Sequence, residues 1–199
     1  MRTHLAQFFQ CLRQSPVIPA IRDSRSLTLA LERGAGVIFV LGEDVFALEE
    51  SARAVREKKG YIFAHIDLIK GVAKDEAGIR SLARGLGIKG VLTTRSNLIG
   101  PAKKEGLIAV QRFFVLDSES LQTGLISVEK ARPDAVEVLP GVIFPKIAER
   151  LKQEAIPPVI AGGLITKEKE VEEILSLGAV GVSTSCQKLW GYMAKGIRP

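Results

Sequence analysis

Short apolar runs rich in β-branched residues recur about every 20 to 30 residues along the chain, and each is followed by a polar stretch. The runs are nearly continuous in apolar residues, which is the pattern of strands buried on both faces of a parallel sheet. Eight strands are predicted: Val17–Ile21, Val37–Leu41, Tyr61–Asp67, Gly90–Thr94, Leu107–Arg112, Ala135–Leu139, Pro158–Ala161 and Val180–Ser183.

The polar stretches between the runs carry helix signals. Apolar residues recur in them at helical spacing, acidic residues cluster at their starts, and glycines mark several returns to strand. Thr166 is the expected N-cap of the helix that it begins. Helices are predicted over Glu43–Lys59, Asp75–Leu86, Phe144–Glu154, Thr166–Leu177 and, after the last run, Cys186–Ala194.

Regular alternation of strand and helix predicts right-handed parallel crossovers. Eight such units close into a TIM (β/α)8 barrel, which leaves no exposed sheet edge. We expect one compact domain over residues 1–199, in which residues 1–16 form a helix that covers the bottom of the barrel. The alternative is an open doubly wound sheet, but no GxGxxG motif follows the first run.

Composition restricts the class of protein further. The chain has 199 residues, of which 46% are hydrophobic and 25% charged, and no apolar run approaches the ~20 residues that cross a bilayer. The first residues lack the pattern of a secretory signal, and Cys11 and Cys186 have neither metal nor redox spacing. These features predict a cytoplasmic protein with reduced thiols and no membrane partner.

The net charge of +6 is concentrated in one part of the chain, since residues 70–104 contain eight Lys or Arg and only two Asp or Glu. Arg80 and Arg84 lie four apart and share a helix face, and neighbouring lysines extend the basic stripe. Such a surface is suited to an RNA backbone, although a merely solvated surface is the competing interpretation. The predicted RNA-binding residues are Arg80, Arg84, Lys89, Lys103 and Lys104.

Functional residues of a TIM barrel lie at the carboxyl ends of its strands. Gly162 and Gly163 follow the seventh run and allow close approach of a ligand to the backbone. Ser183, Thr184 and Ser185 follow the eighth and precede a predicted helix, whose free amides favour an anion. Together the two segments predict the usual phosphate site of such barrels, whereas a plain glycine turn and a serine cap would be the structural alternative.

Charged side chains also lie at the carboxyl ends of other predicted strands. Arg22, Arg95 and Arg112 together are suited to bind a ligand with two negative charges. In the alternative interpretation, each arginine forms an ion pair with Asp67 or Glu137. His65 with these two carboxylates suits acid–base chemistry or polyol binding, and the carboxylates could share a hard cation. None of the eight runs contains a lysine, which argues against a Schiff-base aldolase.

Seven blocks, taken in order, resemble the glycerol uptake operon antiterminator regulatory proteins over residues 17–190. The blocks are Ile18–Arg22, His65–Gly71, Thr93–Ser96, Gln111–Asp117, Val136–Gly141, Ala161–Ile165, and Ser183–Ser185 with Lys188–Trp190. The resemblance implies a regulator that responds to glycerol 3-phosphate and acts on leader messenger RNA. It also implies that the phosphate lies on Gly162, Gly163, Ser183, Thr184 and Ser185, while Arg22, Asp67, Arg95, Arg112 and Glu137 line the rest of the pocket.

Three hypotheses about function therefore stand at the level of sequence. The first is a ligand-gated antiterminator without catalytic residues or cofactor, in which loops and the segment Asp117–Thr123 move. The second is a small barrel enzyme acting on a phosphorylated polyol or sugar, with His65, Asp67 and Glu137 as acid–base groups. The third is a metabolite-binding protein with a protein partner. Homo-oligomerisation is left open.

Overall fold

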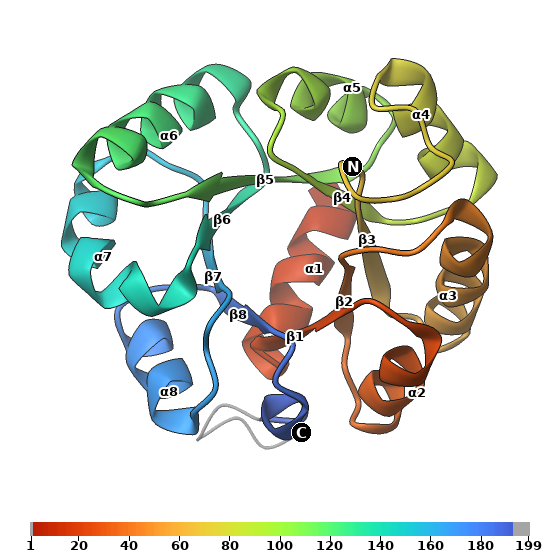
Figure 1. The fold of residues 1–199 in the computed structure, drawn as a ribbon, viewed down its shortest axis with the longest axis horizontal. Helices are drawn as coiled ribbons and strands as arrows, with labels where there is room; N and C mark the ends of the chain where they lie inside the picture. The colour runs from red at the N-terminus through yellow and green to blue at the C-terminus, as the bar shows by residue number, and fades with distance from the viewer. Residues whose placement is uncertain (1, 193–199) are drawn as a thin grey trace.

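The computed structural model describes residues 2–192, and its eight parallel strands form a closed barrel in sequence order (Figure 1). Each strand pairs with the next, and β8 pairs with β1 through the register Ile18 to Ser183. The prediction of a TIM barrel is confirmed. The strands are β1 (Val17–Ile21), β2 (Val37–Val40), β3 (Tyr61–His65), β4 (Gly90–Thr93), β5 (Ile108–Phe114), β6 (Ala135–Leu139), β7 (Val159–Gly162) and β8 (Gly181–Thr184).

Helices α2 to α8 surround the strands (Figure 1). None of the helices in residues 2–192 is long and apolar enough to cross a membrane. The helices are α1 (Arg2–Gln14), α2 (Ser24–Glu32), α3 (Val45–Glu57), α4 (Glu76–Arg80) continued by the π-helical η1 (Ser81–Gly85), α5 (Ile99–Lys104), α6 (Ser118–Ala131), α7 (Phe144–Gln153) and α8 (Glu168–Ser176). Short 3-10 turns are η2 (Ser96–Leu98), η3 (Gly141–Ile143) and η4 (Gln187–Leu189).

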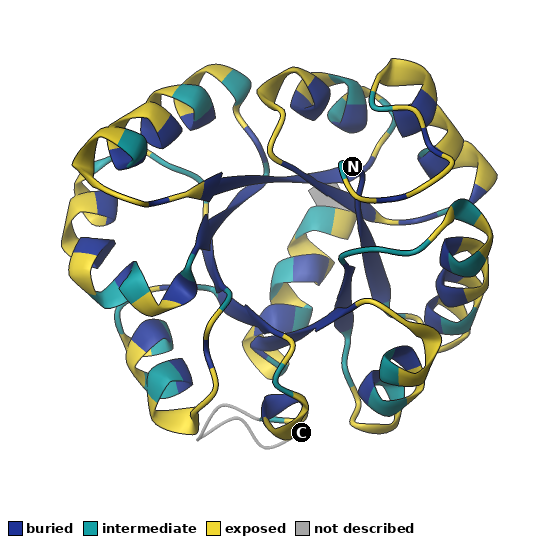
Figure 2. Ribbon diagram, viewed as in Figure 1, coloured by how far each residue is buried: buried dark blue, intermediate teal, exposed yellow. Residues whose placement is uncertain are grey.

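The strands are buried on both faces, as their apolar runs predict (Figure 2). Their outward side chains pack beneath the helices in one large apolar cluster. Their inward side chains form a second cluster inside the barrel, which includes Phe39, Phe63 and Val110. This inner cluster fills the lower part of the barrel, so the polar inward side chains are left at the carboxyl ends of the strands, which we call the mouth.

Helix α1 packs against the opposite end of the barrel and lies behind the ring of strands in Figure 1. Phe8 and Leu12 of this helix belong to the inner apolar cluster. The ring centroids of Phe8 and Phe63 are 5.0 Å apart, and those of Phe39 and Phe63 are 5.3 Å apart. The helix therefore excludes water from the bottom and leaves the mouth as the accessible end of the barrel.

Three predicted helices differ from the structure in their bounds or type. The helix expected from Thr166 begins at Glu168, because the Glu170 carboxylate accepts hydrogen bonds from the amides of Thr166 and Lys167. The helix expected over Cys186–Ala194 is reduced to η4, and its residues 193 and 194 lie outside the described residues. The Asp75–Leu86 helix continues past α4 only as a π turn.

Candidate ligand-binding site

A buried ion pair between two adjacent strands lies inside the barrel at the mouth. Arg112 on β5 is in register with Glu137 on β6, and its Nε lies 2.5 Å from Glu137 Oε2. The other carboxylate oxygen, Oε1, accepts a hydrogen bond from the Ser183 hydroxyl on β8. Glu137 is fully buried and Arg112 is 8% exposed. The pair thus joins three strands and places charge in a dry part of the barrel, where an unpaired carboxylate would be costly.

Gly162 is required by this arrangement. A Cβ at position 162 would overlap Glu137 Oε1 and would lie 2.5 Å from Ser183 Oγ. From the sequence, Gly162 is explained by the close approach of a ligand to the backbone. The structure shows a second reason, because the Glu137 carboxylate occupies the space that a side chain would take. The role of Gly162 in shaping the interior is therefore independent of any phosphate.

His65 belongs to the same polar layer. It is the last residue of β3, it is 4% exposed, and its Nδ1 has no hydrogen-bond partner among the described residues. Burial, and then the positive charge of Arg112, lower the pKa of His65 to about 4. The ring is accordingly neutral near pH 7, with a buried nitrogen that lacks a partner.

Asp67 lies two residues beyond β3 and is held by the loop after β4. It accepts hydrogen bonds from the Thr93 hydroxyl at 3.1 Å, the Thr94 amide at 2.7 Å and the Thr94 hydroxyl at 3.1 Å. Arg95 Nε is 3.4 Å from Asp67 Oδ1, and the Arg95 side chain is half exposed. Two of the three predicted arginines, Arg95 and Arg112, are therefore paired with barrel carboxylates.

Arg22 is placed differently from the other two arginines. It is exposed after β1 and makes no ion pair with any described residue. It lines a hollow of about 630 Å³ between α2 and α3, together with Asp23, Glu43 and Lys70. Burial raises the pKa of Glu43. The structure therefore does not bring all three arginines to one point.

The loops after β7 and β8 lie side by side, because Gly162 pairs with Ser183. The side chains of two predicted phosphate-binding residues are engaged internally: the Ser183 hydroxyl donates to Glu137, and Thr184 Oγ1 donates to the Ile165 carbonyl at 2.7 Å. Both residues belong to β8 and do not cap a helix. The sequence-based prediction places the phosphate on backbone amides of this segment, so these side-chain contacts do not bear on it.

Backbone amides of the same two loops remain available. Gly163 and Leu164 both have left-handed backbones, with φ values of 84° and 62°. The Gly163 amide donates to the Ser183 carbonyl at 3.2 Å, whereas no described residue hydrogen-bonds the amide of Leu164 or Ser185. Leu164 was absent from the predicted set, because no sequence signal marks a leucine that adopts a left-handed conformation.

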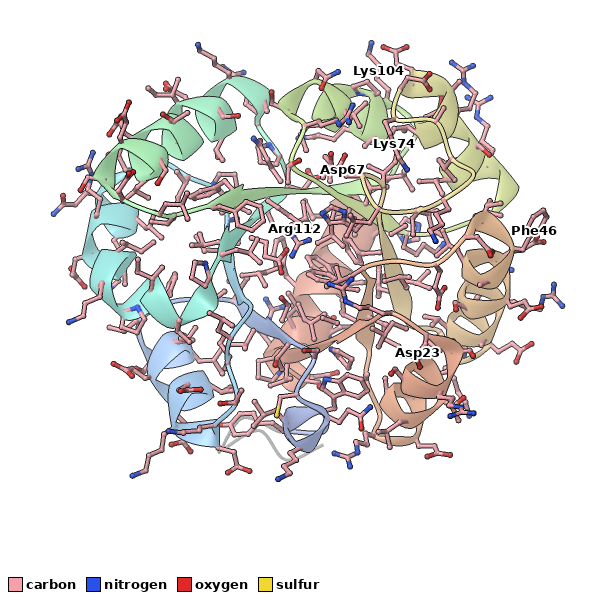
Figure 3. The ribbon with its side chains drawn as sticks, in the orientation of Figure 1. Asp23, Phe46, Asp67, Lys74, Lys104 and Arg112 are labelled. Atoms are coloured by element: carbon pink, nitrogen blue, oxygen red, sulfur yellow. The ribbon has the colours of Figure 1, made fainter. Side chains whose placement is uncertain are left out.

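The predicted basic stripe is only partly paired with carboxylates. Arg80 and Arg84 share a face, as expected, but both contact Glu105, with Nε to carboxylate distances of 3.4 and 2.7 Å. Lys103 lies 3.2 Å from Asp134. Among the five predicted residues, Lys89 and Lys104 are the ones without a carboxylate partner in residues 2–192. Figure 3 shows Lys104 on the outside of the molecule, Arg112 within the ring of strands, and Asp67 near Lys74.

A shared cation is not favoured by this geometry. Asp67 and Glu137 each already have an arginine partner. Over the described part of the chain, no group of three or more His, Cys, Asp or Glu side chains is placed to hold a metal ion.

Comparisons with known proteins agree on one family. A family model described as "Glycerol-3-phosphate responsive antiterminator" matches residues 17–190. The chain is 31% identical over 184 residues to "Uncharacterized protein YgcP" of Escherichia coli (strain K12). This alignment covers 92% of this chain and 96% of the relative.

Solved structures give the same result. The glycerol uptake operon antiterminator regulatory protein from Listeria monocytogenes str. 4b F2365 is similar with a TM-score of 0.82 and 31% identity, covering 87% of this chain and 94% of that one. A glycerol uptake operon antiterminator-related protein from Thermotoga maritima MSB8 is similar with a TM-score of 0.78 and 31% identity, covering 90% and 99%. A likeness at 12% identity to the aldolase QR15, with a TM-score of 0.69, concerns the fold alone.

Proposed function

The chain belongs to the family of glycerol-3-phosphate responsive antiterminators, and from that premise we propose that it binds glycerol 3-phosphate at the barrel mouth and then acts on leader RNA, so that transcription passes a terminator. The observation that supports this most directly is the polar layer of His65, Arg112, Glu137 and Ser183 above an otherwise apolar barrel interior. Such a layer gives a small polyol both donors and acceptors in an environment of low dielectric constant.

The phosphate group is assigned to the loops after β7 and β8. Leu164 and Ser185 supply amides that have no partner among the described residues, and the two loops adjoin through the pairing of Gly162 with Ser183. Phosphate sites of TIM barrels commonly use these two loops. Gly163 brings the backbone close to the ligand, and Arg22 and Arg95 contribute positive charge at the rim.

The glycerol hydroxyls are assigned to the interior layer. The neutral His65 ring has an Nδ1 without a partner among the described residues, and the carboxylates of Asp67 and Glu137 accept hydrogen bonds. A hydroxyl that donates to His65 would satisfy a buried nitrogen that is otherwise costly to leave unpaired. This assigns to His65 a binding role that the family resemblance alone did not include.

We propose that the pocket binds its ligand without transforming it. Asp67 and Glu137 are each held by an arginine and by hydroxyl donors, and His65 is a weak base with a pKa of about 4. A general base works best when its pKa lies near the operating pH and when it is free to accept a proton. These contacts favour recognition over acid–base catalysis. Because a leader transcript is made in the cytoplasm, we place the protein there.

Calorimetric titration of the pure protein with glycerol 3-phosphate tests the proposal. We expect saturable heat with glycerol 3-phosphate, weaker binding of inorganic phosphate, and tighter binding of glycerol 3-phosphate when leader RNA is present, since coupling between two sites is reciprocal. Absence of heat with any phosphate ester would contradict the assignment, and turnover of the ester during the titration would favour an enzyme.

A further inference from the structure

Large apolar side chains are exposed mainly at the mouth of the barrel. Of the seven that are exposed in the described part of the chain, Ile126 lies on α6 and Phe46 lies on α3, where Figure 3 shows it at the outer edge of the molecule, and the other five lie at or after the ends of strands. Exposed apolar side chains gathered on one face of a soluble protein mark an interaction surface. The five residues are Leu68, Phe114, Leu116, Val142 and Leu164.

Cations accompany the apolar side chains on one sector of this face. Lys70 is exposed in the loop after β3, and Arg95 is half exposed in the loop after β4. Lys74 lies close to Asp67 in Figure 3, its ammonium donates a hydrogen bond to the Ile69 carbonyl, and partial burial lowers the pKa of the amino group. All three belong to the basic segment 70–104, whose other arginines are paired with Glu105. The exposed cations of this segment near the mouth are therefore Lys70 and Arg95, of which Arg95 keeps Asp67 as a partner, and Arg22 is a further exposed cation after β1.

A hollow of about 530 Å³ adjoins this sector between β5 and α6. Phe114, which is 52% exposed, lies at its edge, and Gln111 lies inside it. Gln111 is 1% exposed; its Nε2 donates to Ser127 at 2.8 Å, and its Oε1 has no partner among the described residues. Buried amide oxygens usually accept a hydrogen bond from protein or water, so Gln111 Oε1 can accept one from an N–H or O–H group that enters the hollow.

We propose that the face formed by the loops after β3, β4 and β5, together with this hollow, binds single-stranded RNA. Lys70, Lys74 and Arg95 contact phosphates, Phe114 stacks on a base, and Gln111 accepts a hydrogen bond from a base edge in the hollow. This combination of cations with an exposed aromatic ring is how proteins hold single-stranded nucleic acid. The inference rests on the proposed function and moves the RNA contacts from the α4–α5 stripe to the mouth.

Acidic residues also lie in this sector, and Lys70 lines the hollow between α2 and α3 together with Asp23, Glu43 and Asp44. Asp67 is paired with Arg95, and Asp117 accepts a hydrogen bond from the Ser120 amide as the N-cap of α6. Glu119 also lines the hollow. We therefore place the RNA phosphates over the loop after β3, which carries Lys70 and Lys74, and only a base beside α6.

Two ion pairs connect the ligand pocket with the proposed RNA-binding surface. Arg112 lines the hollow and is also the partner of Glu137 inside the barrel. Arg95 belongs to the RNA-binding sector and is also the partner of Asp67. A ligand that changes either ion pair alters the RNA surface directly, so the liganded conformation can be the one that RNA selects.

Two matched pairs of variants test the surface. Phe114→Ala is compared with Ile126→Ala, an exposed apolar residue away from the mouth, and Lys70→Glu is compared with Lys104→Glu in the α4–α5 stripe. Binding of a transcribed 5′ leader RNA of the organism's glycerol uptake operon is measured by filter retention with saturating glycerol 3-phosphate. Loss of a stacked base predicts at least about a fivefold weaker affinity for Phe114→Ala, and Lys70→Glu should reduce it similarly. The two control variants should stay within about twofold of the unsubstituted protein, and calorimetry should give all four unchanged affinity for glycerol 3-phosphate.

The outcomes separate this inference from the proposed function. If the unsubstituted protein binds glycerol 3-phosphate but no leader RNA, both the antiterminator function and the surface are wrong. If it binds RNA and Lys104→Glu alone weakens binding, the α4–α5 stripe is the RNA surface and the present assignment is overturned. If Phe114→Ala changes the sedimentation of the RNA-free protein, the face is an interface between copies of the chain. Ultraviolet cross-linking of RNA to a peptide containing Phe114 would support the assignment.

Discussion

Arg112 and Glu137 occupy adjacent register positions on β5 and β6, and their side chains form an ion pair inside the barrel with 2.5 Å between Nε and Oε2. Because Glu137 is fully buried, its carboxylate depends on this partner and on Ser183 for all of its stabilisation by neighbouring side chains. The pair is therefore part of the predicted binding site and also a condition for the stability of the barrel interior.

Arg112→Met should lower the free energy of unfolding by about 3–5 kcal/mol, because it leaves a buried carboxylate without its cation. Adding Glu137→Gln should restore most of that loss, since the amide carries no charge and can still accept from Ser183. Urea unfolding followed by circular dichroism measures both. Additive losses in the double variant would show that the two side chains do not act as a pair.

Gly162→Ala should destabilise the protein by about 1–3 kcal/mol, the usual cost of forcing an extra methyl group into a packed interior. The new Cβ must displace Glu137 or Ser183, so affinity for glycerol 3-phosphate should fall as well. Gly100→Ala is the matched control, because a Cβ there meets nothing within 4 Å and the residue is in α5. An unchanged melting temperature for Gly162→Ala would contradict the close contact.

The stability of the protein should fall as the pH is lowered from about 6.5 to about 4. His65 has a folded-state pKa of about 4 against an ordinary value of 6.5, so the unfolded chain takes up a proton before the folded one does. Between pH 7 and pH 5 this linkage amounts to about 2 kcal/mol for a shift of this size. The free energy of unfolding at the two pH values should differ less in His65→Gln than in the unsubstituted protein. His4→Gln, which changes the exposed histidine, should leave the difference intact.

His65→Phe should separate binding from stability. The substitution keeps an aromatic ring and removes a buried nitrogen that has no partner among the described residues, so the free energy of unfolding should hold or rise. Affinity for glycerol 3-phosphate should fall about tenfold or more, since a buried hydrogen bond to the ligand is lost, while inorganic phosphate should bind as before. Calorimetry and thermal unfolding of the same samples provide the two readings. A loss of stability without a change in affinity would make His65 a structural residue only.

The apolar runs were sufficient to predict the barrel. The predicted β1 and β6 have the observed bounds, Val17–Ile21 and Ala135–Leu139, because a strand buried on both faces must be apolar along its whole length. Helix ends were less predictable. Thr166 has the chemistry of an N-cap, but the carboxylate of Glu170 satisfies the free amides at this helix start.

The local sequence also indicated which residues lie at the mouth, because position at the end of a strand is a property of the chain itself. It could not indicate which charges meet, since Arg112 and Glu137 are 25 residues apart and become neighbours only through the register of β5 and β6. For the same reason Arg80 and Arg84 looked like free cations until α5 brought Glu105 against both. The order of elements and the chemistry available at the mouth were determined by the sequence. The pairing of charges, and the lack of a partner within residues 2–192 for the nitrogen of His65 and for the amides of Leu164 and Ser185, were decided by the tertiary structure, because electrostatic and hydrogen-bond partners depend on distances in space.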